Sequence, residues 1–237
     1  MASHDLKEPL RGIHRYAHQL LETELAQDPV NRTRITSLMR LTVRMDSLLD
    51  SLLHFARVGR TNLERSAVDL DELVDEAVEM IGARSTLQPT WLIRPYPLPK
   101  VFCDPVRVRE VFSNLFSNAL KYCREDAPQV EVGCLQPGQV AHAASGASAA
   151  DGLVFYVRDN GIGIEARHFG PIFRIFKRLH GPNEFGGGVG AGLSIVQKVV
   201  QRHGGRTWLE SQPGVGSTFY FTLGADVTVG TNGAMPP

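Results

Sequence analysis

Two long stretches near the N-terminus repeat apolar residues at helical spacing. The first stretch alternates steps of four and three, at Leu6, Leu10, Ile13, Ala17 and Leu20. The second alternates steps of three and four, at Ile35, Leu38, Thr42, Met45, Leu49, Leu52 and Ala56. Such a seven-residue repeat is typical of helices that pack along a shared seam. Because Asp28-Pro29 separates the stretches, they are predicted to form an antiparallel helical hairpin.

The second helix carries more apolar surface than one partner helix can cover. Leu41, Leu48 and Phe55 form an extra stripe beside its seam. A bundle of four helices contributed by two chains would bury such a wide face. We therefore expect a homodimer that assembles through residues 1–57.

Beyond residue 58 the pattern becomes a mixture of helices and strands. A polar connector over 58–66 comes first. Helices are predicted over 69–85, 105–122 and 193–203, and strands over 91–93, 130–135, 153–158, 207–210 and 218–223. An Ala/Ser/Gly-rich loop insertion is expected over 136–152. The fold class is therefore predicted to be α+β, with a helical hairpin over 1–60, a mixed domain over 61–224 and a disordered tail over 225–237.

Composition excludes several classes of protein. Lys plus Arg number 25, as do Asp plus Glu, and this balance argues against a dedicated nucleic-acid binder. No apolar stretch approaches the roughly 18 residues of a membrane-spanning helix, and no signal peptide is recognised. The three cysteines, Cys103, Cys123 and Cys134, are scattered and are read as small buried apolar residues. We expect a cytoplasmic protein without membrane insertion.

One predicted helix presents polar side chains suited to a metal ion and a phosphate. Asn114, Asn118 and Lys121 follow one another at steps of four and three, so they share one helix face. Amide oxygens suit Mg²⁺ and a lysine suits phosphate. Taken alone, a solvated polar face explains this pattern better.

A short glycine-containing segment follows the strand predicted over 153–158. It reads Asp159-Asn160-Gly161-Ile162-Gly163-Ile164. Its glycines permit a tight turn and a close approach of a ligand. Asp159 could accept a hydrogen bond from an exocyclic amine such as that of adenine. An ordinary turn explains the segment equally well.

A glycine-rich run over 186–193 opens the last predicted helix. Backbone N–H groups in such a loop favour phosphate. The run loosely matches a dinucleotide-binding fingerprint, but residues 178–185 before it are polar and do not form the strand that this fingerprint needs. No Gly-Lys pair occurs in the chain, so a Walker-type phosphate loop is excluded.

In this order, with the Phe-rich segment 172–178 and Gly214-Val215-Gly216-Ser217-Thr218-Phe219, these motifs resemble the ATP-binding domain of histidine kinases. That domain belongs to the GHKL superfamily, which includes gyrase-type, Hsp90-type and MutL-type ATPases. The resemblance implies an α/β sandwich of the GHKL (Bergerat) type that binds ATP and Mg²⁺.

The resemblance also implies roles for individual residues. Asn118 would coordinate Mg²⁺, and Asn114 would lie close to the phosphates. Asp159 would read the adenine amine. The other implied nucleotide-binding residues are Lys121 and Tyr122, Gly161 and Gly163 beneath the base, the phosphate-contacting Arg178, the lid hinge Gly188, Gly190 and Gly192, and Thr218 at the base of the adenine pocket.

The amide at Asn114 bears on the reaction. Gyrase-like ATPases carry a glutamate at the matching position, where it activates water. An amide is a poor general base, so the site is expected to favour phosphotransfer over hydrolysis.

Residues 3–11 resemble the phosphoacceptor box of histidine kinases. If Leu6 and Leu10 occupy the seam, His4 and Asp5 lie on the opposite, exposed face. A neutral imidazole is a good nucleophile, and Asp5 could hold one ring nitrogen protonated while the other attacks phosphorus. The simpler reading of an exposed histidine is a solvated side chain. A metal site at His14 and His18 is disfavoured because no further ligand completes it.

Four stretches resemble phytochrome-type histidine kinases more specifically, namely 4–13, 50–60, 155–164 and 172–205. This resemblance implies a sensory domain upstream, of the bilin photosensory kind, and a response regulator receiver domain as partner. Many related kinases carry Thr or Asn where Glu8 stands, so phosphatase activity is doubtful. The function expected is an autophosphorylating histidine kinase. The alternatives are a degenerate dimeric scaffold that binds nucleotide without catalysis and a GHKL ATPase.

Overall fold

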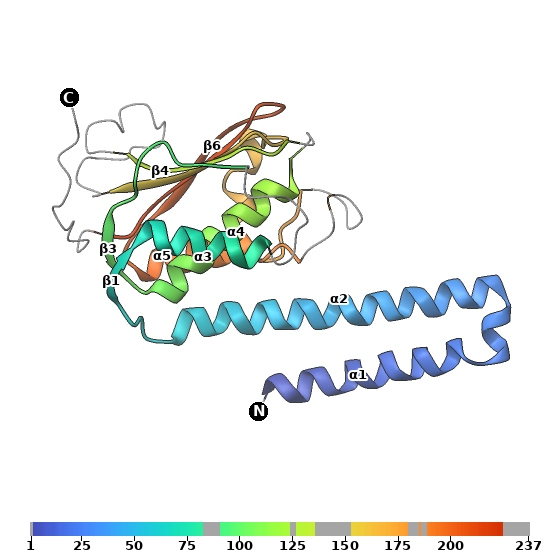
Figure 1. The fold of residues 1–237 in the computed structure, drawn as a ribbon. Coiled ribbons are helices and arrows are strands. Elements are labelled where there is room, and N and C mark those ends of the chain that lie inside the picture. The colour runs from blue at the N-terminus through green and yellow to red at the C-terminus, as the bar shows by residue number, and fades with distance from the viewer. Residues whose placement is uncertain are drawn as a thin grey trace, which may run out of the picture. The chain divides into compact units, whose positions relative to one another are not determined.

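The structure is a computed structural model that describes residues 2–82, 91–123, 127–135, 153–179, 185 and 189–224, with only the helical backbone described for residues 2–6. The chain divides into two compact units, Met1–Arg57 and Val58–Pro237, and both are drawn in Figure 1. The expected loop over 136–152, the tail over 225–237 and the end of the helix expected to reach 85 lie outside the described residues.

The first unit is the predicted helical hairpin. It consists of α1 (Ala2–Leu21), the short 3-10 helix η1 (Glu24–Gln27) and α2 (Pro29–Arg60), whose last three residues belong to the second unit. Asp28 accepts a hydrogen bond from the backbone N–H of Val30 at 3.1 Å and so caps the start of α2. Between the helices, the Lys7 ammonium pairs with the carboxylates of Asp46 and Asp50.

The hairpin of one chain leaves much of its apolar pattern in contact with solvent. Leu10, Ala17 and Ile35 are buried, in agreement with the predicted seam. Leu38 and Met45 belong to the same seam but are 47% and 50% exposed. Since two helices can cover only one side of each other, the remaining apolar face has no cover within the unit.

The second unit contains a five-stranded sheet. Its order is β2 (Leu92–Ile93), β4 (Val130–Leu135), β5 (Val154–Asp159), β7 (Gly216–Thr222) and β6 (Thr207–Gln212). The β2–β4 pair is parallel and the other pairs are antiparallel. The strand pair predicted from residues 130–135 and 153–158 is therefore confirmed.

A separate two-stranded sheet was not expected from the sequence. It pairs β1 (Ser66–Asp69) with β3 (Lys100–Cys103). The stretch read as a connector over 58–66 in fact completes α2 at Arg60 and enters β1 at Ser66. Each strand has only four residues, too few for a clear alternating pattern. In the sequence, α3 and β2 lie between the two strands, so no local signal indicates their pairing.

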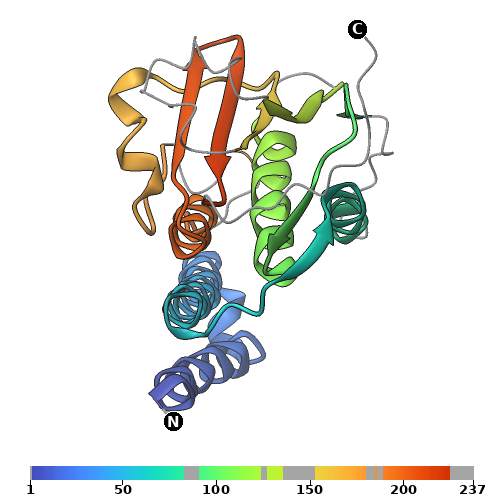
Figure 2. The ribbon, with the colours of Figure 1, turned by 90° about the vertical axis from the view of Figure 1, so that its left-hand side faces the viewer.

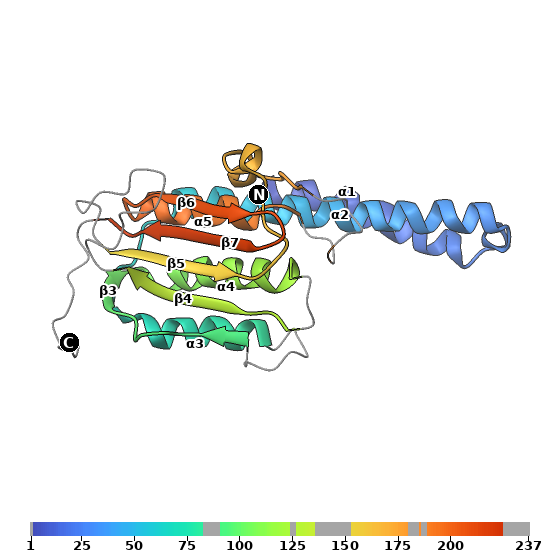
Figure 3. The same ribbon diagram turned by 90° about the horizontal axis from the view of Figure 1, so that it is seen from above.

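Three helices cover one face of the larger sheet, as Figures 2 and 3 show from two directions. They are α3 (Leu70–Gly82), α4 (Pro105–Lys121) and α5 (Gly192–Arg202). Two short 3-10 helices, η5 (Ala166–His168) and η6 (Pro171–Phe173), precede α5. No helix in the described part of the chain is both long and apolar enough to span a membrane.

Aromatic rings join α4 to the sheet. Phe112 of α4 is fully buried, with its ring centroid 5.7 Å from that of Phe221 on β7 and 5.8 Å from that of Phe116. Phe221 in turn lies 5.4 Å from Phe155 on β5. Such pairs add to the free energy gained by burying the rings. The position of α4 beneath the sheet therefore depends on this cluster.

We predict that Phe112→Ala lowers the free energy of unfolding of the second unit by about 3–5 kcal/mol, because it leaves a cavity at this junction. Urea denaturation would measure the loss. Val106→Ala is the matched control, since Val106 is 56% exposed on the same helix and its change should stay within about 0.5 kcal/mol. Equal losses for the two variants would contradict this account of the core.

Candidate functional site

A pocket opens where the end of α4, the end of β5 and the start of α5 meet. Its walls come from segments that lie far apart in the sequence. The lining residues are Asn118, Tyr122, Asp159, Ile162, Gly163, Ile164, Ile172, Lys177, Arg178, Leu179, Leu193, Ser217 and Phe219. The fold thus brings together Asn118 of the polar helix face, the Asp-containing turn and the segment before the glycine-rich run.

Helix α4 contributes Asn118, and its C-terminal capping residue Tyr122 lies one turn further; both line the pocket. Asn114 lies one turn before Asn118. Its side-chain amide donates to the carbonyl of Glu110 at 2.9 Å. Its Oδ1 lies against Gly192 at the start of α5, where a Cβ would come within 2.8 Å of that oxygen.

Lys121 lies beside the pocket and is not among its lining residues. Its Nζ lies 5.0 Å from the ring centroid of Tyr122, at the distance of a cation–π contact. The Tyr122 ring also lies 5.5 Å from that of Phe185, at a tilted angle. Of the predicted pair, Tyr122 lines the pocket and Lys121 contacts it through the Tyr122 ring.

Asp159, the last residue of β5, places a carboxylate in the pocket. Its Oδ1 accepts hydrogen bonds from the backbone N–H groups of Gly161, at 2.9 Å, and Ser217, at 3.2 Å. Burial raises the pKa of this carboxyl above its ordinary value, and the two hydrogen bonds only partly oppose that shift. The group is therefore a hydrogen-bond acceptor that the backbone holds in place at the pocket wall.

The two glycines after Asp159 are required by close backbone approach. Gly163 has a φ of +71°, and a Cβ there would lie 2.0 Å from the carbonyl oxygen of Gln212. At Gly161 a Cβ would come within 2.8 Å of both Asp159 Oδ1 and the carbonyl oxygen of Tyr122. A side chain at either position would push the turn out of the pocket.

The pocket is electrically asymmetric. Lys177 and Arg178 bring positive charge to one part of its lining, and Asp159 brings a carboxylate to another. Gly190 holds the segment of the two cations in place, because its carbonyl accepts from the N–H of Phe176 at 2.9 Å and its φ is +78°. A ligand with an anionic part, an apolar middle and a hydrogen-bond donor would match this arrangement.

Thr218 corrects the expectation from the sequence. It does not line this pocket but a second one, together with Glu131, Arg158 and Glu210. Arg158 donates to its Oγ1 at 3.4 Å. Side chains alternate along a strand, so Ser217 and Phe219 face the helices and Thr218 faces the other way. Ser217 takes the place expected for Thr218, and the period-two pattern counted back from Phe221 would have revealed it.

Some predicted site residues cannot be placed relative to the pocket. Gly188 lies outside the described residues, and the side chains of His4 and Asp5 do as well, although both residues belong to α1. Among the described side chains, no group of three or more His, Cys, Asp or Glu is placed to hold a metal ion. His14 contacts the hydroxyl of Thr42 at 2.9 Å, and His18 lies 3.5 Å from Glu22.

Comparison with known proteins now identifies the class. Residues 103–227 match the family of histidine kinase-, DNA gyrase B- and HSP90-like ATPases. This match covers more than half of the chain. The chain belongs to this family.

Similar proteins identify the chain more narrowly as a catalytic module of the sensor histidine kinase class. The chain is 47% identical to Cyanobacterial phytochrome B of Nostoc sp. over 225 residues, which cover 94% of the chain and 28% of that protein. It is 35% identical to Phytochrome-like protein Cph1 of Synechocystis sp., with the same two shares. The chain therefore spans little more than a quarter of the length of these relatives.

Solved structures agree on the fold. The crystal structure of full-length ShkA in complex with AMPPNP superposes with a TM-score of 0.61 at 24% identity. The match covers 95% of this chain and 45% of that one. The predicted GHKL-type fold is therefore confirmed.

We predict that Gly163→Ala destabilises the second unit by about 1–3 kcal/mol, since the new Cβ would meet the backbone of Gln212 and φ is positive. Thermal unfolding followed by circular dichroism would show the change. Gly170→Ala is the control, because a Cβ there meets nothing within 4 Å and φ is −77°. The explanation fails if both variants melt like the parent.

Proposed function

We propose that this chain is the catalytic module of an ATP-dependent histidine kinase, which phosphorylates its own His4 and passes the phosphoryl group to an aspartate of a response regulator. The observation that carries the proposal is the pocket that brings Asn118, Asp159 and Arg178 together. Membership of the family supports ATP as the ligand. The AMPPNP complex of full-length ShkA supports it as well.

The polarity of the pocket suits the two ends of ATP. The Asp159 carboxylate would accept a hydrogen bond from the adenine amine, and the side chains of Ile162 and Leu193 would pack against the base. Lys177 and Arg178 would neutralise phosphate oxygens. In this assignment the carboxylate meets the donor of the base, and the two cations meet the negative phosphates.

Asn118 fits a role in holding Mg²⁺. Its amide oxygen is a hard ligand, and it lies one helical turn beyond Asn114 in the pocket wall. Mg²⁺ commonly takes only one or two ligands from the protein and the rest from phosphates and water. When bound, the ion would neutralise charge on the phosphates.

For transfer, the lone pair of one His4 ring nitrogen would attack the γ-phosphorus. The bond from phosphorus to the oxygen that bridges to the β-phosphate would break, and ADP would leave. Asp5 would hold the proton on the other ring nitrogen and stabilise the positive charge that develops on the ring. Such a reaction depends on placement and charge neutralisation more than on covalent help from the protein.

Asn114 favours transfer over hydrolysis. Its amide nitrogen is already engaged with the Glu110 carbonyl, and an amide cannot take a proton from an attacking water. The pocket would therefore retain ATP until a phosphoacceptor arrives. This argument weighs against the alternative of a GHKL ATPase.

The exposed apolar face of the hairpin supports a homodimer. Leu38, Leu41, Met45 and Leu52 are each more than 40% exposed in one chain. A second copy would cover them in a four-helix bundle. Since the chain spans 28% of its phytochrome relatives, we further propose that a sensory domain acts on this module from the remaining part of the protein.

We predict that the chain incubated with Mg²⁺ and ATP labelled at the γ-phosphate takes up label that is stable to base and labile to acid. His4→Gln would abolish the label by removing the acceptor. Asn118→Ala would reduce it by about 100-fold or more, because it removes the proposed Mg²⁺ ligand. His18→Gln, on the same helix and exposed, should leave it unchanged.

The pattern of results separates the candidates. Label that persists in His4→Gln would refute the assignment of the acceptor. A parent chain that binds ATP without taking up label would favour the degenerate scaffold. Release of inorganic phosphate without labelled protein would favour the ATPase.

We predict that Asp159→Asn lowers nucleotide affinity without lowering stability. The raised pKa means that the carboxyl group favours the folded state below pH 3.8, and that this contribution is lost as the pH rises through the folded-state pKa. At neutral pH the variant should therefore unfold at the same temperature as the parent or higher. Its affinity for ATP should fall by roughly tenfold or more, because the adenine amine loses a charged acceptor.

Thermal unfolding and equilibrium binding measured on the same samples would test this pair of effects. Asn160→Ala, one residue further along the turn, provides the comparison for a general disturbance of the segment. A loss of stability together with unchanged affinity would overturn the role given to Asp159.

A further inference from the structure

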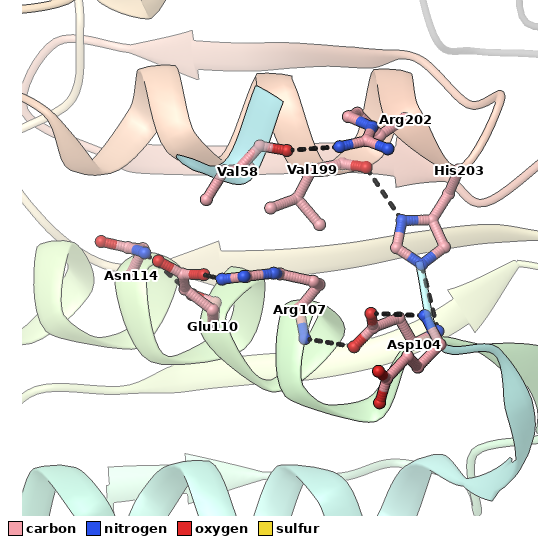
Figure 4. A network of polar contacts seen from close by, with 9 residues as sticks. Val58, Asp104, Arg107, Glu110, Asn114, Val199, Arg202 and His203 are labelled. Atoms are coloured by element: carbon pink, nitrogen blue, oxygen red, sulfur yellow. Dashed lines mark hydrogen bonds and ion pairs between the residues drawn. The ribbon is translucent and has the colours of Figure 1, made fainter. Parts of the chain in front are cut away.

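Helices α4 and α5 are joined by a hydrogen-bonded histidine at the end remote from the pocket. His203 follows α5 directly and is 3% exposed, and Asp104 precedes α4 and is 6% exposed. The backbone N–H of Asp104 donates to His203 Nε2 at 3.1 Å. On its other side the ring contacts the Val199 carbonyl through Nδ1 at 2.9 Å (Figure 4).

These two contacts define the state of the imidazole. A carbonyl can only accept, so Nδ1 must carry a hydrogen, and an amide N–H can only donate, so Nε2 must be bare. Burial lowers the pKa of His203 from its ordinary value of 6.5, which agrees with a neutral ring. Arg65, Asp104 and Arg202 are the charged groups whose fields reach it.

Asp104 also makes two hydrogen bonds through its carboxylate, and we call Asp104, His203 and their hydrogen-bond partners the joint. Its Oδ1 accepts from the backbone N–H of Arg107 at 3.1 Å and so caps α4. Its Oδ2 accepts from the N–H of Glu64, in the segment before β1, at 3.0 Å. Beside it, Arg202 donates to the carbonyl of Val58 at 2.8 Å. One joint therefore holds α4, α5 and the first residues of the second unit.

Closer to the pocket, the same two helices meet again where Asn114, in the middle of α4, lies against Gly192 at the start of α5; the neighbouring Asn118 and Leu193 line the pocket itself. Asn114 lies ten residues after Asp104, which is about 15 Å along α4, and Gly192 lies eleven residues before His203, which is about 16 Å along α5. Asn114 Oδ1 faces Gly192 there. The stretch of α4 from Asp104 to Asn114 and the stretch of α5 from Gly192 to His203 are nearly equal in length. The joint at Asp104 therefore sets which residue of α5 stands opposite Asn114.

We propose that His203 is a positioning residue for nucleotide binding: by tying Asp104 to Val199 it sets the register of α4 against α5 and thereby the places of Asn114 and Asn118. The inference rests on the proposed function, since it deepens the account of the same pocket. A histidine that merely filled the core would affect stability without affecting this register.

Two substitutions at His203 separate its roles. His203→Phe keeps a ring of similar size and removes both hydrogen bonds. His203→Gln retains an acceptor for the Asp104 N–H and so should rescue much of the effect. We predict that His203→Phe weakens the affinity of the chain for Mg-ATP by roughly tenfold to a hundredfold, as a displaced side chain in a binding site does. His168→Gln, in the same unit and not among the residues that line the pocket, is the control.

Binding would be measured well below the unfolding temperature of each variant, with folding checked by circular dichroism. Affinity equal to that of the parent in a folded His203→Phe chain would overturn the proposal. If that variant does not fold, the pH profile decides. As the pH falls through the pKa of His203, which burial places below 6.5, the affinity of the parent should fall more steeply than that of His203→Gln, because protonation removes the acceptor at Nε2. Identical profiles would overturn the proposal.

A readout without nucleotide keeps this inference separate from the proposed function. The side-chain amide signals of Asn114 in a ¹⁵N-labelled chain should shift in His203→Phe and stay in place in His168→Gln. If the parent does not bind ATP, the proposed function fails, and the Asn114 signals still report on the register. Unshifted Asn114 signals in a folded His203→Phe chain would overturn the inference.

Discussion

The packing of α4 against the sheet is the constraint on which the rest of the second unit depends. Phe112 and Phe116 bury one side of this helix against Phe221 and its neighbours, so the helix cannot roll about its axis without opening a cavity. This packing sets the rotation of α4 about its own axis, and with it the direction in which Asn118 points. An apolar contact thus controls the geometry of a polar site.

The pocket places its charges at a cost in stability. Asp159 is held partly out of water by two backbone N–H groups, and its raised pKa shows that burial disfavours the carboxylate in the free protein. A donor from a ligand would relieve that cost. Groups held in an unfavourable state before the ligand arrives are common where a protein must recognise a specific donor.

The joint at Asp104 and His203 complements the aromatic core. The core sets the rotation of α4, whereas hydrogen bonds at its first residue set its position along its own axis relative to α5. The same joint holds Glu64 and lies beside the Arg202–Val58 contact, at the point where the second unit begins. Directional bonds perform this task because apolar packing alone permits sliding by one turn.

Local patterns in the sequence determined the hairpin, the helices α3, α4 and α5 and the β4–β5 pair, because each depends on periodicity, caps or turn residues within a short window. They also singled out Asn118, Asp159 and Gly163, whose motifs are contiguous, whereas Arg178 was identified through the family resemblance. The tertiary structure decided the β1–β3 pair, the exchange of Thr218 for Ser217 in the pocket and the partner of His203. Each of these depends on which residues from distant segments face one another, and the packing of the complete chain sets that arrangement.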